Sequence, residues 1–325
     1  MNSPLFIVGL PRSGSTLLSK IINASPDILC VNDLYYLQSV LSLQAAKGKL
    51  ERNTAVRLID LILHVISLRS LAGDSFIGQI SIAGPQIECI RNKITNQHLK
   101  LRFDWAALLD ATLTEVALQS GKKRWADKTP QNFLHIKRLH RAFPAAKLIF
   151  IFRDPRHVLA SYKYADAEGH DKRRYHPVIY SLYWRTAVRR YLSVLKEIKG
   201  IRMIRYEDII KNPGSVIDRI NAFLETSIEN PDLENIGSNT SFKSGMRKNL
   251  TETENWICQK ICFQEMSILG YKPQPANWRL ACLPGLSFLT FRFFLFQIRR
   301  VLFQRDGRKR ILALLGSALR YKNLQ

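Results

Sequence analysis

The sequence predicts an α/β protein: a three-layer sandwich with a central parallel sheet, a helical insertion and a basic C-terminal tail. Short apolar runs typical of strands buried on both faces recur along the chain, for example in residues 4–9 and 147–152. Each run ends in a polar turn followed by apolar residues at helical spacing, a unit that builds parallel sheets covered by helices. We therefore expect residues 1–278 to form one core domain and residues 279–325 a basic, aromatic-rich extension.

Five strands are expected, and helices separate them along the chain. The predicted strands are residues 4–9, 27–31, 124–126, 147–152 and 201–206. Helical periodicity marks residues 17–24, 34–71, 103–119 and 131–143, and further helices start near Arg156 and Pro213. The long helical segments between the second and third strands form the insertion. Ligands of such sheets bind beyond the carboxyl ends of the strands, so the polar residues there are the candidates for function.

The chain is strongly basic, because 49 Lys and Arg against 26 Asp and Glu give a net charge of +23. Residues 279–325 hold ten of these cations and one acid, Asp306, so this segment carries +9 and the remainder +14. Such an excess favours anionic partners such as phosphorylated cofactors, acidic substrates, anionic lipid or nucleic acid, and charge alone does not choose among them. The sequence contains no recognisable base-reading module, so no nucleic acid partner is expected.

The cysteines and the N-terminal residues are used to predict the cellular compartment of the protein. Five scattered cysteines, an odd number, favour reduced thiols over a disulfide framework. Cys258 and Cys262 lie one helical turn apart, but no second Cys or His pair has ligand spacing, so no metal site is predicted. The first apolar run begins at Leu5 without a preceding basic region, so we expect no signal peptide and a cytoplasmic protein.

The segment Gly9–Thr16 matches the G-x-x-x-x-G-x-[ST] frame of a phosphate-binding loop (P-loop), between a predicted strand and a predicted helix. Backbone N–H groups in such a loop bind an anion at the helix N-terminus. The lysine that nucleotide hydrolases place before the final hydroxyl residue is absent, and Ser15 stands there. Arg12 is the cation that this loop offers instead. The pattern predicts an anion other than ATP, and a Gly-Ser turn that only joins strand and helix is the simpler alternative.

At this point the sequence resembles the sulfotransferase family, over about residues 4–272 and with specific motifs at two phosphate sites. The loop is similar to the family's binding loop for the 5′-phosphosulfate of 3′-phosphoadenosine 5′-phosphosulfate (PAPS). The resemblance implies a P-loop-like fold, PAPS as the cofactor and no metal. The implied loop contacts are Pro11, Arg12, Ser13, Gly14, Ser15 and Thr16.

Three further elements of the resemblance concern the rest of the cofactor. Arg153 at a strand end and Ser161 eight residues later match the family's pair for the 3′-phosphate. In the stretch R-Y-E-D, Tyr206 is implied near the adenine and Asp208 in support of the fold. The pair Arg247-Lys248 resembles a C-terminal loop that closes over the 3′-phosphate, and a solvated charge pair is the alternative there.

The resemblance also implies roles in the transfer itself. Lys128, in the turn D-K-T-P, is similar to a lysine that faces the bridging oxygen in the tyrosylprotein and heparan branches, and Arg12 stabilises charge that develops on transfer. Asp33, just after the second strand, occupies the place of the general base, where relatives usually carry Glu. A surface lysine and a helix N-cap are the alternatives for Lys128 and Asp33, and His135 and His157 are reserve bases.

The expected function is therefore sulfuryl transfer from PAPS to an acceptor hydroxyl or amine, carried by a small molecule, lipid, saccharide or peptide. Two alternatives stay open. One is a P-loop nucleotide kinase or hydrolase with Asp154 as its metal-holding acid, and the other is a non-enzymatic basic protein that binds nucleic acid or membrane. The missing lysine at Ser15 argues against the first, and two spaced phosphate motifs are unexplained by the second.

The tail holds an aromatic run, Leu286–Phe296, followed by Arg299, Arg300 and a cluster of later cations. The run is too short to span a bilayer. It predicts either an interfacial helix in peripheral contact with a membrane or a helix whose aromatic residues pack on the core.

Overall fold

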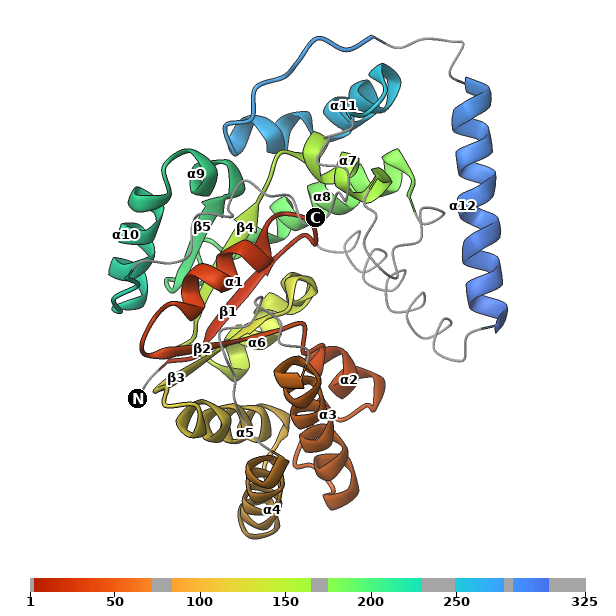
Figure 1. Ribbon diagram of the computed structural model, residues 1–325. Helices are drawn as coiled ribbons and strands as arrows, with labels where there is room; N and C mark the ends of the chain where they lie inside the picture. The colour runs from red at the N-terminus through yellow and green to blue at the C-terminus, as the bar shows by residue number, and fades with distance from the viewer. Residues whose placement is uncertain (1–2, 72–83, 165–174, 230–248, 278–282, 304–325) are drawn as a thin grey trace. The chain divides into compact units, whose positions relative to one another are not determined.

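The computed structural model describes residues 3–71, 84–164, 175–229, 249–277 and 283–303. Figure 1 shows the helices and strands in chain order. The chain divides into two compact units. The first unit comprises Met1–Arg153 and Thr186–Asn239, and the second comprises Asp154–Arg185 and Thr240–Gln325.

The first unit is built on a parallel sheet of five strands in the order β2-β3-β1-β4-β5. The strands are β1 (Leu5–Gly9), β2 (Ile28–Asn32), β3 (Arg124–Lys128), β4 (Lys147–Phe152) and β5 (Ile201–Arg205). The sheet confirms all five predicted strands. The second strand is shifted by one residue, to Ile28–Asn32. The third continues past the predicted end at Ala126 through Asp127 and Lys128, because these two residues pair with Val31 and Asn32 of β2.

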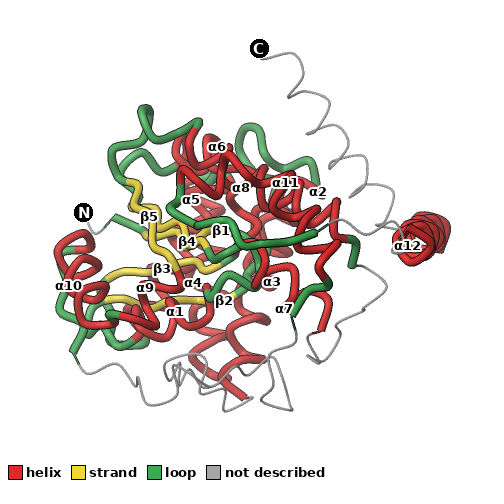
Figure 2. Tube along the Cα trace, turned by 90° about the horizontal axis from the view of Figure 1, so that it is seen from above, coloured by secondary structure: helices red, strands yellow, loops and turns green. Residues whose placement is uncertain are grey.

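Helices cover both faces of this sheet (Figure 2). On one face, α1 (Ser15–Asn23), α9 (Tyr206–Lys211) and α10 (Pro213–Leu224) pack aliphatic side chains against the strands. The other face carries aromatic rings, among them Phe6, Trp125 and Phe150. Phe6 and Trp125 contact Phe143, which follows α6 (Ile136–Ala142) and contacts the start of α5 (Trp105–Gln119). Phe150 contacts Phe133 in the 3-10 turn (Pro130–His135). The three-layer α/β sandwich with a central parallel sheet is thus confirmed.

The helical insertion lies between β2 and β3, as predicted. It consists of α2 (Tyr36–Ser42), α3 (Arg52–Leu71), α4 (Gly84–Leu101) and α5. Helix α4 was missed by the sequence analysis, because its buried face is a narrow row of Ile90, Ile94 and His98 within an otherwise polar segment. Such a row gives little of the periodic signal on which a helix prediction depends.

The second unit is helical. It contains α7 (Pro155–Tyr164), the first part of α8 (Pro177–Leu192), α11 (Glu252–Ile268) and α12 (Leu283–Phe303). Thr251 and Glu254 form a capping box at the start of α11, and Lys163 on α7 makes an ion pair with Glu254 at 2.7 Å. Within the described part of the chain, no helix combines the length and the apolar character needed to cross a membrane.

Candidate functional site

The phosphate-binding loop follows β1 at the carboxyl end of the sheet. Gly9, at φ 151°, lies so close to β4 that a Cβ atom there would overlap the carbonyl oxygen of Ile151. Arg12 and Gly14 both have left-handed backbone conformations, with φ of 74° and 92°. Left-handed residues alternating with others turn successive N–H groups toward a common concave side, which binds anions. The loop leads into α1 at Ser15. The positive end of the helix dipole of α1 further favours an anion in the loop.

Arg153 and Tyr206 hold this loop from the neighbouring strands. The Arg153 guanidinium, at the end of β4, donates a hydrogen bond from Nη1 to the carbonyl oxygen of Arg12 at 3.3 Å. Its Cζ atom lies 4.4 Å from the centroid of the Tyr206 ring, a cation–π contact. A Cβ atom on Gly14 would overlap the same ring. Residues predicted from three separate motifs therefore meet at one edge of the sheet.

The loop also fits the anion that the sequence analysis assigned to it. The Ser13 side chain is fully buried, and no hydrogen-bond partner for its Oγ exists in the described part of the protein. A buried hydroxyl without a partner is costly unless a ligand satisfies it. The oxygens of a phosphate or sulfate group would do so, and the backbone of the loop presents donors of the same kind.

Asp33 and Lys128, the predicted base and the predicted leaving-group lysine, form an ion pair with 2.8 Å between Oδ2 and Nζ. They come from adjacent strand ends, because Asn32 of β2 is in register with Lys128 of β3. The Lys128 side chain is 3% exposed and that of Asp33 29% exposed. Asp33 has a left-handed backbone with φ of 54°, and its N–H donates to the carbonyl oxygen of Lys128 at 2.7 Å. Neither residue is the surface lysine or the helix N-cap of the simpler alternatives.

A buried carboxylate next to this pair escaped the sequence analysis. Asp127 accepts hydrogen bonds from the Thr129 hydroxyl at 2.6 Å and from the Asn132 amide at 2.9 Å. Gln38 on α2 donates in turn to Asn132 at 3.2 Å. Complete burial is the main reason that the pKa of Asp127 rises to about 7. The available signal was its position at the end of a strand in a parallel sheet, where helices cover both faces and bury the side chains on either side.

The remaining predicted residues belong to other parts of the structure. Ser161 is buried on α7 in the second unit. Arg247 and Lys248 lie outside the described residues. His157 is exposed, and burial lowers the pKa of His135 to about 4. Asp208 makes an ion pair with Arg205 at 2.7 Å, as expected of a structural acid.

Asp154, the acid of the kinase alternative, forms an ion pair with Arg156. The Arg156 guanidinium donates to both carboxylate oxygens of Asp154, at 2.8 and 2.5 Å. Its other contacts are the Gln259 side chain and the carbonyl oxygen of Lys272. Across the described ranges, no three His, Cys, Asp or Glu residues gather as a metal site would require.

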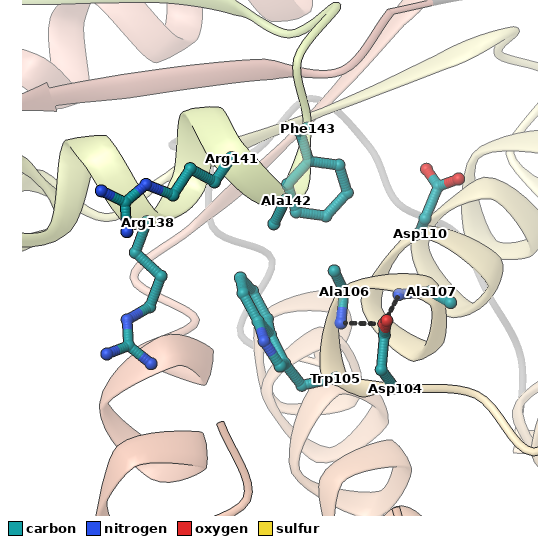
Figure 3. Close-up of a pocket in the computed structure, with 9 residues that line it drawn as sticks. All are labelled: Asp104, Trp105, Ala106, Ala107, Asp110, Arg138, Arg141, Ala142 and Phe143. Atoms are coloured by element: carbon teal, nitrogen blue, oxygen red, sulfur yellow. Dashed lines mark hydrogen bonds between the residues drawn. The ribbon is translucent and has the colours of Figure 1, made fainter. Parts of the chain in front are cut away.

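A pocket of about 510 Å³ lies elsewhere in the first unit, between the start of α5 and the end of α6 (Figure 3). It contains none of the predicted site residues. Its two carboxylates already serve the fold, because Asp104 caps α5 and Asp110 accepts a hydrogen bond from the Trp125 indole at 2.9 Å. The lining consists of Asp104, Trp105, Ala106, Ala107, Asp110, Arg138, Arg141, Ala142 and Phe143.

Comparison with known families agrees with this geometry. Residues 4–230 match the profile of the Sulfotransferase family. This chain belongs to the sulfotransferase family. The match favours an enzyme that transfers a sulfuryl group over the kinase or hydrolase and the non-enzymatic alternatives.

Two curated relatives are similar in sequence to this sulfotransferase. A Caenorhabditis briggsae protein with the provisional name protein-tyrosine sulfotransferase is 24% identical over 315 residues, which cover 89% of this chain and 96% of that protein. The nodulation protein NoeE of Sinorhizobium fredii is 27% identical over 158 residues, which cover 49% of this chain and 30% of NoeE.

Solved structures of other sulfotransferases are more distant. The sulfotransferase domain of the Synechococcus PCC 7002 olefin synthase is 18% identical, with a TM-score of 0.48 over 89% of this chain and 94% of that domain. Mouse sulfotransferase SULT7A1 in complex with PAP is 14% identical, with a TM-score of 0.39 over 82% of this chain and 84% of that one. Both TM-scores are below 0.5, so the family assignment rests on the family profile.

Proposed function

We propose that this sulfotransferase moves the sulfuryl group of PAPS to a hydroxyl or amine of its acceptor by in-line displacement. The observation that carries the proposal is the cluster of Arg153, Tyr206 and Arg12 at the ends of β4, β5 and β1. It joins an anion-binding loop to a cation and an aromatic ring at adjacent strand ends. These are the groups needed for a nucleotide with two separate anionic ends.

PAPS would supply an activated sulfuryl group and a bisphosphate leaving group. The loop residues Pro11–Thr16 would bind its 5′-phosphosulfate, with Arg12 as the cation that meets developing charge. We assign Tyr206 to the adenine and Arg153 to the 3′-phosphate. Ser161, Arg247 and Lys248 remain predicted 3′-phosphate contacts on the strength of their sequence motifs alone.

Lys128 would donate an N–H hydrogen bond to the bridging oxygen of the leaving group, and Asp33 would take the proton of the acceptor hydroxyl or amine. An ammonium group has three N–H donors, so Lys128 can hold Asp33 and meet a second oxygen at the same time. The sulfuryl group carries less charge than a phosphoryl group, so the chain's own cations suffice and we expect no metal requirement.

We propose an acceptor from the classes of small molecules, lipids, saccharides and peptides. The name of the C. briggsae relative indicates a tyrosine hydroxyl, which belongs to this range of nucleophiles. We further propose that residues 279–325 make peripheral contact with a membrane, since they carry ten cations and one acid.

The direct test is to incubate the purified full chain with PAPS labelled in its sulfur and with fractionated cell extract. The sulfur label should appear on a component of the extract, and adenosine 3′,5′-bisphosphate should form as the second product. The labelled component is the acceptor. Recovery of the bisphosphate with labelled free sulfate, and no labelled acceptor in any fraction, would instead indicate a hydrolase.

A further inference from the structure

Helix α12 exposes a continuous row of large apolar side chains. Phe288, Phe291, Phe294, Leu295 and Ile298 are between 48% and 66% exposed, and we call them the α12 stripe. At 100° per residue these positions fall within about 120° of the helix circumference. Scattered exposed apolar residues are ordinary, but a row of five on one helix face marks an interaction surface.

The opposite face of α12 already has a partner in the second unit. The Thr290 hydroxyl lies 3.0 Å from Nε2 of His176. The Phe293 side chain is 9% exposed, and its ring centroid is 5.6 Å from that of His176. These contacts fix which face of the helix is turned inward. The α12 stripe is therefore available to something outside the described part of the chain.

The net charge of the segment that contains the stripe identifies the occupant. Arg292, Arg299 and Arg300 belong to α12, which contains no acid, and residues 279–325 together carry +9. A second copy of this helix would bring like charges together, which opposes self-association. An anionic lipid surface complements the cations and accepts aromatic side chains at the level of its headgroups. No described helix can cross a membrane, so α12 would lie along the surface.

We propose that the α12 stripe inserts into the surface of an anionic lipid bilayer, with the helix axis parallel to the membrane plane. The stripe provides the apolar contact and the arginines of residues 279–325 provide attraction to acidic headgroups. This goes beyond peripheral contact through charge alone, because it assigns the contact to particular side chains. It does not depend on sulfuryl transfer, since vesicle binding can be measured without donor or acceptor.

The test is sedimentation of the full chain with phosphatidylcholine vesicles that contain or lack phosphatidylserine. The full chain should bind the anionic vesicles, and added salt should weaken but not abolish binding. Phe288→Ser combined with Phe291→Ser should reduce vesicle affinity at least about tenfold. The matched control is Phe263→Ser on α11, since Phe263 is 60% exposed against 62% for Phe288 and lies outside the stripe. This control should bind like the unmodified chain.

Three results would overturn the proposal. The first is no binding of the full chain to anionic vesicles. The second is an equal loss in Phe263→Ser and in the stripe variant, which would show a non-specific effect of exposed aromatic residues. The third is a dimer in light scattering that the stripe substitutions dissociate, which would assign the surface to a second copy of the chain. An unchanged far-UV circular dichroism spectrum and an unchanged thermal unfolding midpoint for each variant confirm that the fold is intact.

Discussion

Lys128 and Asp33 are joined twice, by an ion pair of 2.8 Å between their side chains and by a hydrogen bond of 2.7 Å from the Asp33 N–H to the Lys128 carbonyl oxygen. The residue proposed to assist the leaving group is thus in contact with the residue proposed to accept the proton. During transfer, negative charge would develop on the leaving group next to Lys128, and the acceptor would lose its proton to Asp33. Each can be removed separately, and the two losses should differ.

We expect Lys128→Met to lower kcat by about 10² to 10³, because the variant lacks a donor for charge that develops only in the transition state. Binding of adenosine 3′,5′-bisphosphate should change much less. The control is Lys137→Met, since Lys137 makes a surface ion pair with Glu197 at the same 2.8 Å distance. Steady-state kinetics and calorimetry measure both quantities. Equal kcat in the two variants would remove Lys128 from the mechanism.

We expect Asp33→Asn to lower kcat by about 10² to 10⁴ while bisphosphate affinity is retained, because a general base acts on the acceptor. Asp60→Asn is the control, since Asp60 makes a surface ion pair with Arg91 at 2.7 Å. If bisphosphate affinity and kcat fall together in Asp33→Asn, Asp33 supports the structure of the site rather than taking a proton.

Arg153 should determine which nucleotide the enzyme prefers. We expect calorimetry without magnesium to show adenosine 3′,5′-bisphosphate binding more tightly than ATP. Arg153→Met should narrow that gap by a factor of about 10 to 150, which corresponds to about 1.5 to 3 kcal/mol for a charged contact. Arg202→Met is the control, since the Arg202 guanidinium also lies over a ring, that of Phe223, at 4.9 Å. If ATP with magnesium binds as tightly as the bisphosphate, the result supports the nucleotide kinase or hydrolase alternative instead.

Gly14 should tolerate no side chain. Its φ of 92° is unfavourable for alanine, and a Cβ atom would overlap the Tyr206 ring. We expect Gly14→Ala to lower the free energy of unfolding by about 1 to 3 kcal/mol and to weaken bisphosphate binding. Gly214→Ala is the control, since a Cβ atom there meets nothing within 4 Å. Urea unfolding that is identical for both variants would show that the loop can move away from Tyr206.

Asp127 should make stability depend on pH. Burial raises its pKa to about 7, whereas an aspartate in an unfolded chain titrates near pH 4. Between about pH 4 and pH 7 the folded state therefore binds more protons, so this group makes the free energy of unfolding fall as pH rises. Asp127→Asn should make that fall shallower in urea unfolding across this range. An unchanged slope would show that Asp127 does not titrate there.

The sequence by itself determined the sheet and the loop. Five apolar runs predicted five strands, because a strand buried on both faces must be apolar throughout, and that requirement is local. The frame Gly9–Thr16 and the missing lysine at Ser15 predicted an anion-binding loop for the same reason: tight turns and helix N-termini are fixed by neighbouring residues. Arg153, Lys128 and Asp33 were identified as candidates by their resemblance to sulfotransferase motifs, and all three were expected near the carboxyl end of the sheet, where ligands bind.

Only the tertiary structure decided which of these residues meet. The contact between Lys128 and Asp33 depends on the register of β2 against β3, and that of Arg153 with Tyr206 on the pairing of β4 with β5. Strand order and register are set by packing between segments more than 90 residues apart in the first case. The burial that shifts the pKa of Asp127 is likewise a property of everything packed around it. The outward face of α12 was decided by its contacts with His176, which no periodicity in the helix itself encodes.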